Sequence, residues 1–107
     1  MKVIRWDAGA RRFASDKMQK VGLFASERFF LDLYCLEPGQ QQKAHAHADS
    51  DKVYLVVEGS GRFRVGDAEA TLGPGEAVMA QPGETHGIAN DSAGRLVVLA
   101  LMAPPPA

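Results

Sequence analysis

All three histidines of this chain occur in two short segments that follow tight turns. His45 and His47 lie two residues apart after Glu37-Pro38-Gly39, and His86 follows Pro82-Gly83. In an extended strand, residues two apart project from the same face, so the first two imidazoles can meet at one point. A third imidazole from another strand would leave coordination positions open for water or substrate. We therefore predict a divalent transition-metal site (Fe, Mn, Ni, Cu or Zn) at His45, His47 and His86, with three unrelated histidines as the alternative.

The spacing of these two segments resembles the two sequence motifs of the cupin superfamily. The matching positions are Gly39, His45, His47, Lys52 and Gly59 in the first motif, and Gly75, Gln81, Pro82, Gly83, His86 and Asn90 in the second. The resemblance covers about half of the chain directly. It implies an all-β fold, a small antiparallel β-barrel of the jelly-roll-like double-stranded β-helix type, with both motifs facing inward around the metal.

Two positions depart from the motifs of the family. Gln81 stands where the second motif has proline, but Pro82-Gly83 still makes a turn that can direct His86. Lys52 stands where the first motif has a glutamate that ligates the metal. An ammonium about 4 Å from a divalent ion would be repelled by roughly 8 kcal/mol at an effective dielectric near 20.

Three arrangements would reconcile Lys52 with a metal. Its side chain points away from the site, burial keeps it neutral, or a bulge turns Asp51 inward as a replacement carboxylate. We favour a three-histidine site with Lys52 turned aside or outward, and place Asp51 second as a fourth ligand. With Lys52 inward and no metal, the pocket would suit an anionic ligand.

Strand parity nominates the residues of a substrate pocket. Tyr54 shares a face with Lys52, while Phe63 and Met79 lie on other strands expected to face the core. The phenol of Tyr54 is our candidate for a catalytic proton donor near a bound substrate. Glu84 and Asp49, which are close in sequence to His86 and His47, are candidates to orient an imidazole through its second nitrogen. Asn90 is interpreted as structural, bonding the backbone of the following turn.

Short apolar runs separated by Gly, Pro, Asn or Asp predict an all-β chain with almost no helical periodicity. The N-terminal segment 1–18 and the tail 104–107 are expected to be peripheral, with a loop or short helical turn at 8–12. The expected strands are 19–25, 28–36, 43–47, 53–57, 62–65, 68–72, 77–81, 86–89 and 96–102.

Length and composition bound the classes of function. A chain of 107 residues with 46% apolar composition predicts one domain, 1–107. Twelve basic and 13 acidic residues, a net charge of −1, give no basic surface for nucleic acid. No apolar run is long enough to span a membrane or to act as a secretory signal, so we expect a cytoplasmic protein. Cys35, the single cysteine, lies in an apolar strand pattern and is interpreted as core.

The resemblance and the histidines together favour a small metal-binding cupin that acts on a small organic molecule. Oxygenase-type chemistry is the leading class that the resemblance implies, with isomerase or lyase chemistry next. The alternative is a non-catalytic cupin that binds an anionic or sugar-like ligand without metal. The apolar strand 96–102 and the pair Phe29-Phe30 offer more apolar surface than one small barrel buries, which predicts a homodimer.

Overall fold

The computed structural model describes residues 1–106, which form nine β-strands and one short 3-10 helix, η1 (Ala8–Ala10). The strands are β1 (Gln19–Ala25), β2 (Phe30–Leu36), β3 (Gln41–His45), β4 (Asp51–Glu58), β5 (Gly61–Val65), β6 (Ala68–Leu72), β7 (Ala77–Ala80), β8 (His86–Ala89) and β9 (Leu96–Ala103). The predicted strands are therefore all present. Ala107, the last residue of the expected tail, lies outside the described residues.

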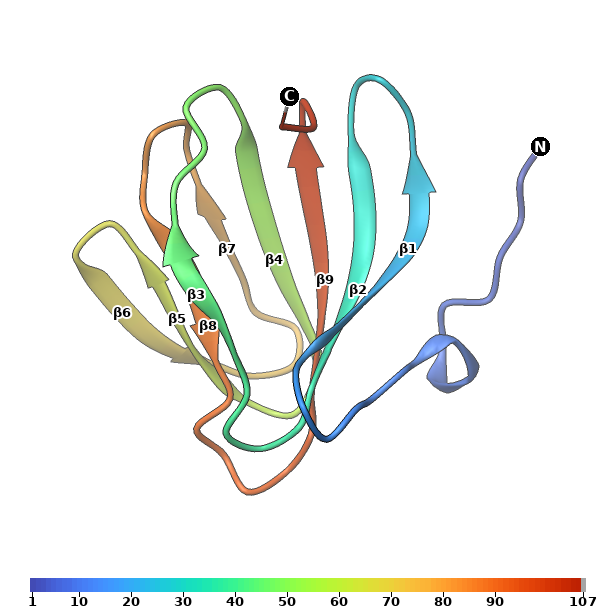
Figure 1. The fold of residues 1–107 in the computed structure, drawn as a ribbon, viewed down its shortest axis with the longest axis vertical. Coiled ribbons are helices and arrows are strands. Elements are labelled where there is room, and N and C mark those ends of the chain that lie inside the picture. The colour runs from blue at the N-terminus through green and yellow to red at the C-terminus, as the bar shows by residue number, and fades with distance from the viewer. Residues whose placement is uncertain (107) are drawn as a thin grey trace.

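The strands form two antiparallel sheets that face each other (Figure 1). One sheet has five strands in the order β1-β2-β9-β4-β7, and the other has four in the order β3-β8-β5-β6. In each sheet a late strand pairs between earlier ones, because β9 lies between β2 and β4 and β8 lies between β3 and β5, as in a jelly-roll. The predicted fold class is thus confirmed.

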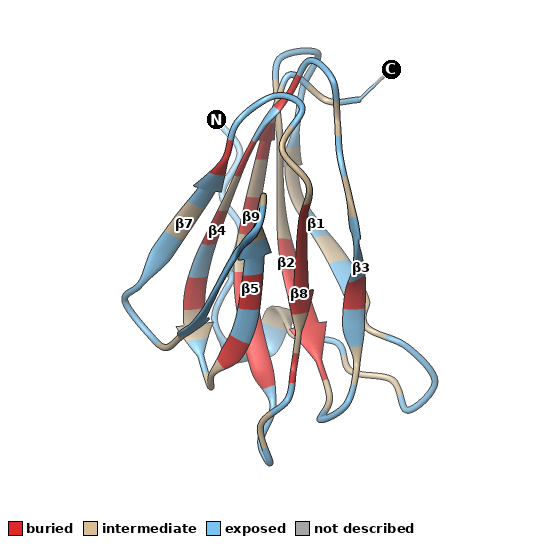
Figure 2. Cartoon of the chain, turned by 90° about the vertical axis from the view of Figure 1, so that its left-hand side faces the viewer, coloured by how far each residue is buried: buried red, intermediate tan, exposed pale blue. Residues whose placement is uncertain are grey.

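The loops divide the barrel into two ends. The loops 46–50 and 81–85 lie at the upper end of Figure 1 together with the C-terminal end of β9, and we call this the site end. The loops 37–40 and 90–95 lie at the opposite end, which we call the packed end. Figure 2 shows the buried residues mainly on β2, β9, β4, β5 and β8. β6 at the edge of the four-stranded sheet has no buried residue.

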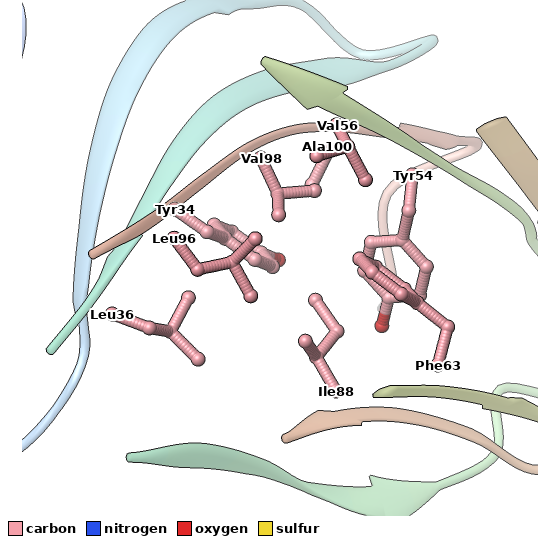
Figure 3. Close-up of a cluster of buried hydrophobic side chains, with 9 residues drawn as sticks. All are labelled: Tyr34, Leu36, Tyr54, Val56, Phe63, Ile88, Leu96, Val98 and Ala100. Atoms are coloured by element: carbon pink, nitrogen blue, oxygen red, sulfur yellow. The ribbon is translucent and has the colours of Figure 1, made fainter. Parts of the chain in front are cut away.

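The main core fills the space between the sheets toward the packed end (Figure 3). Period-2 alternation explains its composition, because each strand sends every second residue inward. Its buried members are Tyr34, Leu36, Tyr54, Val56, Phe63, Ile88, Leu96, Val98 and Ala100.

A second apolar cluster lies on the outer face of the five-stranded sheet. Leu33, Cys35 and Val97 are fully buried there, with Ala10 and Phe13 of the N-terminal segment packed against them. Cys35 is therefore a core residue, as predicted. The expected loop or turn at 8–12 is the 3-10 helix η1, capped by the carboxylate of Asp7, which accepts a hydrogen bond from the backbone of Gly9.

One strand ends earlier than expected, and the difference affects the site. We predicted an extended segment at 43–47, whereas β3 ends at His45. The pairing of β3 with β8 shifts in register between Gln42 and His45, which is the signature of a bulge. His47 therefore comes from the loop rather than from strand alternation.

No helix in the described part of the chain is long and apolar enough to cross a membrane. The cytoplasmic location expected from the sequence stays a prediction.

Candidate metal centre

Two of the three histidines lie opposite each other on neighbouring strands. His45 at the end of β3 and His86 at the start of β8 are register partners. The two strands approach closely beside them, because a Cβ at Gly87 would lie only 2.9 Å from the carbonyl oxygen of Gln42 and 3.0 Å from the Cα of Ala44. Glycine at position 87 thus allows the bulged strand β3 to bring His45 beside His86.

The third histidine is placed by the turn that precedes β8. The backbone N–H of Gly83 donates to the carbonyl oxygen of His47 at 2.8 Å, which ties the loop 46–50 to the turn 81–84. The imidazole centroid of His47 lies 4.8 Å from that of His45 and 5.5 Å from that of His86. One ligand atom from each of the three histidines lies within 4.8 Å of the other two, so the predicted ligands do converge.

Backbone carbonyls fix the orientation of two of these rings. The Nδ1 of His45 lies 2.7 Å from the carbonyl oxygen of Lys43, and that of His86 lies 3.1 Å from the carbonyl oxygen of Glu84. A carbonyl only accepts, so each Nδ1 carries the proton and each Nε2 keeps its lone pair for a metal. The side chain predicted for this role is used elsewhere, because the Glu84 carboxylate accepts from the backbone N–H of Gln81. Asp49 is exposed and Glu84 acts through its main chain, so neither candidate carboxylate orients an imidazole in this structure.

The Nε2 atom of His86 is buried and has no hydrogen-bond partner among residues 1–106. A buried polar atom without a partner is costly unless something binds it. Burial also lowers the pKa of His86 and of His47, and the charge of His45 lowers both further. Neutral imidazoles with free Nε2 lone pairs are the donors that Zn, Cu, Fe, Ni and Mn accept, so the residues present fit such an ion.

Lys52 points into the barrel, so of the two orientations that we favoured, aside or outward, the outward one was wrong. Alternation along β4 sends Lys52, Tyr54 and Val56 inward together, and Lys52 is only 2% exposed. Its Nζ donates a hydrogen bond of 2.8 Å to the hydroxyl oxygen of Tyr34. The ammonium also lies 5.1 to 5.4 Å from the ring centroids of Tyr34, Phe30 and Tyr54. Burial lowers the pKa of Lys52 to about 8.

Tyr54 joins the lysine to the histidines. Its ring centroid is 6.0 Å from that of His86, and the Nζ of Lys52 is 5.4 Å from the Tyr54 centroid. Its hydroxyl donates to the side-chain oxygen of Gln42 at 2.6 Å. Burial raises the pKa of Tyr54 far above its ordinary value, so the phenol keeps its proton.

The other nominated residues differ in where they lie. Phe63 is inside the barrel, with its ring 5.6 Å from that of Tyr54. Met79 is 49% exposed on the outer face of the five-stranded sheet, opposite Val53 in register, so its predicted place in the pocket was wrong. Asp51 is exposed at the start of β4, next to the inward Lys52 and therefore on the other face. It does not belong to the group of ligand atoms, so our second choice, a fourth ligand at Asp51, was also wrong.

Sequence reasoning missed the residues that surround Lys52. Phe30 was assigned to the apolar surface of a dimer, Tyr34 was interpreted only as a strand residue, and Gln42 was not considered. Parity along β2 does place Phe30, Asp32 and Tyr34 on the inner face, so the signal was present in the alternation.

The comparisons with known proteins agree with this geometry. The sequence model of the cupin domain family matches residues 32–102, which includes all three histidines. The chain belongs to the cupin family. Among curated proteins, none matches this chain.

Solved structures resemble the whole chain. TT1209 from Thermus thermophilus is 46% identical, with a TM-score of 0.93 over 96% of this chain and 98% of its own. An RmlC-like cupin from Desulfovibrio desulfuricans is 25% identical, with a TM-score of 0.85 over 98% of this cupin and 99% of its own chain. A predicted oxalate decarboxylase from Thermotoga maritima is 20% identical, with a TM-score of 0.78 over 82% of this chain and 81% of its own. This likeness shows the fold alone.

Proposed function

We propose that this cupin binds one divalent transition-metal ion through His45, His47 and His86 and acts there on a small organic molecule. The observation that carries the proposal is the buried Nε2 of His86, which has no hydrogen-bond partner among residues 1–106. One ligand atom from each of the three histidines lies within 4.8 Å of the other two. An ion held by three imidazoles would supply Lewis acidity and open coordination positions. Oxygenase-type chemistry is our first choice of reaction class, and isomerase or lyase chemistry is our second.

A cavity at the site end supports access for a small molecule. It has a volume of about 270 Å³ and is lined by His47, Ala48, Asp49, Ser50 and the prolines at 104–106. His47 borders this cavity and also belongs to the histidine group, which supports the proposal that a ligand enters from the site end.

The residues beneath the histidines would position the ligand. Tyr54 keeps its proton and donates to Gln42, so a rotation of its hydroxyl toward the ligand would make it a hydrogen-bond donor. We propose Tyr54 as the proton donor of the reaction. Phe63 packs on the Tyr54 ring and limits where that ring can move.

A second function is favoured by one observation, the inward position of Lys52. Without a metal, the same interior would hold three imidazoles and a buried ammonium, which suits an anionic ligand. The second candidate is therefore a metal-free, non-catalytic binding protein for a small anion.

We also propose that the protein acts as a homodimer joined through the outer face of the five-stranded sheet. Met79 and Leu55 are 49% and 38% exposed on this face, where Met79 pairs with Val53 and Leu55 pairs with Leu99. A single protomer leaves this apolar surface in water, which a second copy would cover. Sedimentation at several concentrations tests it: Met79→Asp should shift the protein toward monomer, and an unchanged dimer would contradict this choice of face.

The test of the metal proposal is elemental analysis of protein purified without chelator and after reconstitution with Fe, Mn, Ni, Cu or Zn. We expect close to one ion per chain in the native protein. His45→Ala and His86→Ala should each lose it, because two imidazoles do not complete the site.

The matched control is Gln81→Ala, an exposed residue of the same turn whose side chain lies outside the ligand group. It should keep the metal. A native protein that binds no metal after reconstitution, while circular dichroism shows it folded, would contradict the proposal and favour the metal-free candidate.

A further inference from the structure

The interior of the barrel holds one buried ammonium, that of Lys52. Lys20 is exposed on the edge strand β1, where its Nζ lies 5.3 Å from the ring centroid of Tyr34. Asp32 lies on the inner face of β2, and burial raises the pKa of its carboxyl despite the two lysines. No ion pair within 4.0 Å joins either lysine to a carboxylate in the described residues. A divalent ion on three neutral imidazoles would add two more positive charges.

The ammonium of Lys52 is held in place but not satisfied. Its one hydrogen bond within residues 1–106 goes to Tyr34, although an ammonium has three donors. Three aromatic rings surround it and the side chain is 2% exposed, so it cannot turn to water without unpacking the core. Two N–H donors thus remain free in a buried space, which calls for an acceptor with negative charge.

The free donors and the free imidazole nitrogen belong to the same space. His86 lies on the four-stranded sheet and Lys52 on the five-stranded sheet, and the ring of Tyr54 is near both. Both side chains are 2% exposed, so each faces the interior across the gap between the sheets. Tyr54 is therefore a shared neighbour of the Lys52 ammonium and of the histidine group.

On these grounds we infer that Lys52 is the recognition residue for a small carboxylate, which binds at the metal by one oxygen group and places a carboxylate on the Lys52 ammonium. This rests on the proposed metal function. The ligand supplies the negative charge that a glutamate at position 52 would otherwise supply. Metal and carboxylate therefore stabilise each other's binding.

The experiment compares carboxylate binding to the cobalt-loaded native protein and to Lys52→Met. Methionine is similar in length and apolar, so the aromatic cage can hold it while the charge is removed. The probe is malonate, followed by the visible absorption of cobalt, and malonamide is the uncharged counterpart of the same shape. We expect malonate affinity to fall by roughly 30-fold or more in Lys52→Met, because a buried charge partner is lost. Malonamide should bind both proteins equally and weakly.

Two further variants keep the result interpretable. Lys52→Arg retains the positive charge and should recover part of the affinity, whereas Lys2→Met removes an exposed lysine far along the chain and should change nothing. Cobalt affinity without malonate is measured in parallel, and we expect it to rise in Lys52→Met because a repelling charge is gone.

The outcomes separate this inference from the proposed function. Equal malonate affinity in native protein and Lys52→Met, with cobalt bound in both, would overturn the inference and leave the metal centre standing. A native protein that binds no cobalt would overturn both. Malonate binding to that metal-free protein, if lost in Lys52→Met, would instead support the metal-free anion-binding candidate.

Discussion

The two ends of the barrel are built from the same strands but hold opposite kinds of side chain. At the packed end, inward residues such as Leu36, Leu96 and Ile88 form an apolar cluster that excludes water (Figure 3). At the site end, the inward residues are histidines and Lys52. Alternation makes both sets face inward, and only their chemistry differs. The packed end therefore stabilises the fold, and it allows the site end to keep polar groups that cost stability.

The polar groups of the site end are only partly compensated. Tyr34 and Gln42 each accept one hydrogen bond there, from Lys52 and Tyr54 respectively. The Nε2 of His86 has no partner, and burial lowers the pKa of Lys52 to about 8. Groups left unsatisfied in this way are typical of functional sites, which trade stability for binding.

The largest effect is expected at the packed end. Leu96→Ala removes a fully buried side chain from the main core and should lower the free energy of unfolding by about 2–5 kcal/mol. Urea unfolding measures this change, and metal content of the folded variant should stay that of the native protein. A folded variant that has lost its metal would show that packing at the packed end also determines metal binding at the site end. That result would contradict the separation of roles between the two ends.

The next effect concerns the pH dependence of stability at the site end. Burial lowers the pKa of Lys52 in the folded state to about 8, from an ordinary value of 10.5. Between these two values the unfolded chain binds more protons, so stability rises with pH across that window. Below about pH 8 the charged, buried Lys52 carries its full cost. The gain from about pH 8 to 10.5 should be roughly 3 kcal/mol for the metal-free protein.

Lys52→Met is the control for this pH dependence. The variant has no titrating group at position 52, so urea unfolding of its metal-free form should lack the rise between about pH 8 and 10.5 attributed to Lys52. At pH 7 it should also be more stable than the native protein, because the buried charge is gone. The same rise in both proteins would assign the effect to another group.

A smaller effect on the free energy of unfolding is expected at Asn90, whose side chain bonds the backbone at the packed end. Asn90 is 1% exposed and donates to the carbonyl oxygens of Leu36 and Gly94, while its own oxygen accepts from the backbone of Ser92. Asn90→Ala leaves buried carbonyls without donors and should cost about 1–3 kcal/mol. Thermal unfolding measures it, with exposed Asp91→Ala as the control in the neighbouring position. A stability like that of the native protein would contradict the structural role predicted for Asn90.

Sequence alone predicted the fold better than the details of the site. Turn residues and alternation located every strand, and the spacing of the histidines predicted their convergence. The sequence did not predict that His47 comes from a loop. The bulge that ends β3 early is set by close packing against Gly87 and not by local propensity. Parity with Tyr54 indicated that Lys52 points inward. We favoured another direction because Lys52 occupies the position of the metal-ligating glutamate of the family, where an inward ammonium would repel the ion. Its cage of rings comes largely from β2, which is distant in sequence, so alternation placed those rings inward but could not show that they surround Lys52.

The smallest effect is expected at Asp51, which adjoins Lys52 in sequence but lies on the other face of β4. Its carboxylate is exposed and outside the group of ligand atoms, so Asp51→Asn should change the affinity for cobalt by less than about twofold, the effect of one screened surface charge. Competition with a metal indicator measures it, with His45→Ala as the variant that loses the ion. A tenfold or larger loss in Asp51→Asn would mean that β4 turns when metal binds and brings the carboxylate inward. The site end would then have to rearrange when metal binds, unlike the packed end, since the register of β4 with β9 in this structure keeps Asp51 outside.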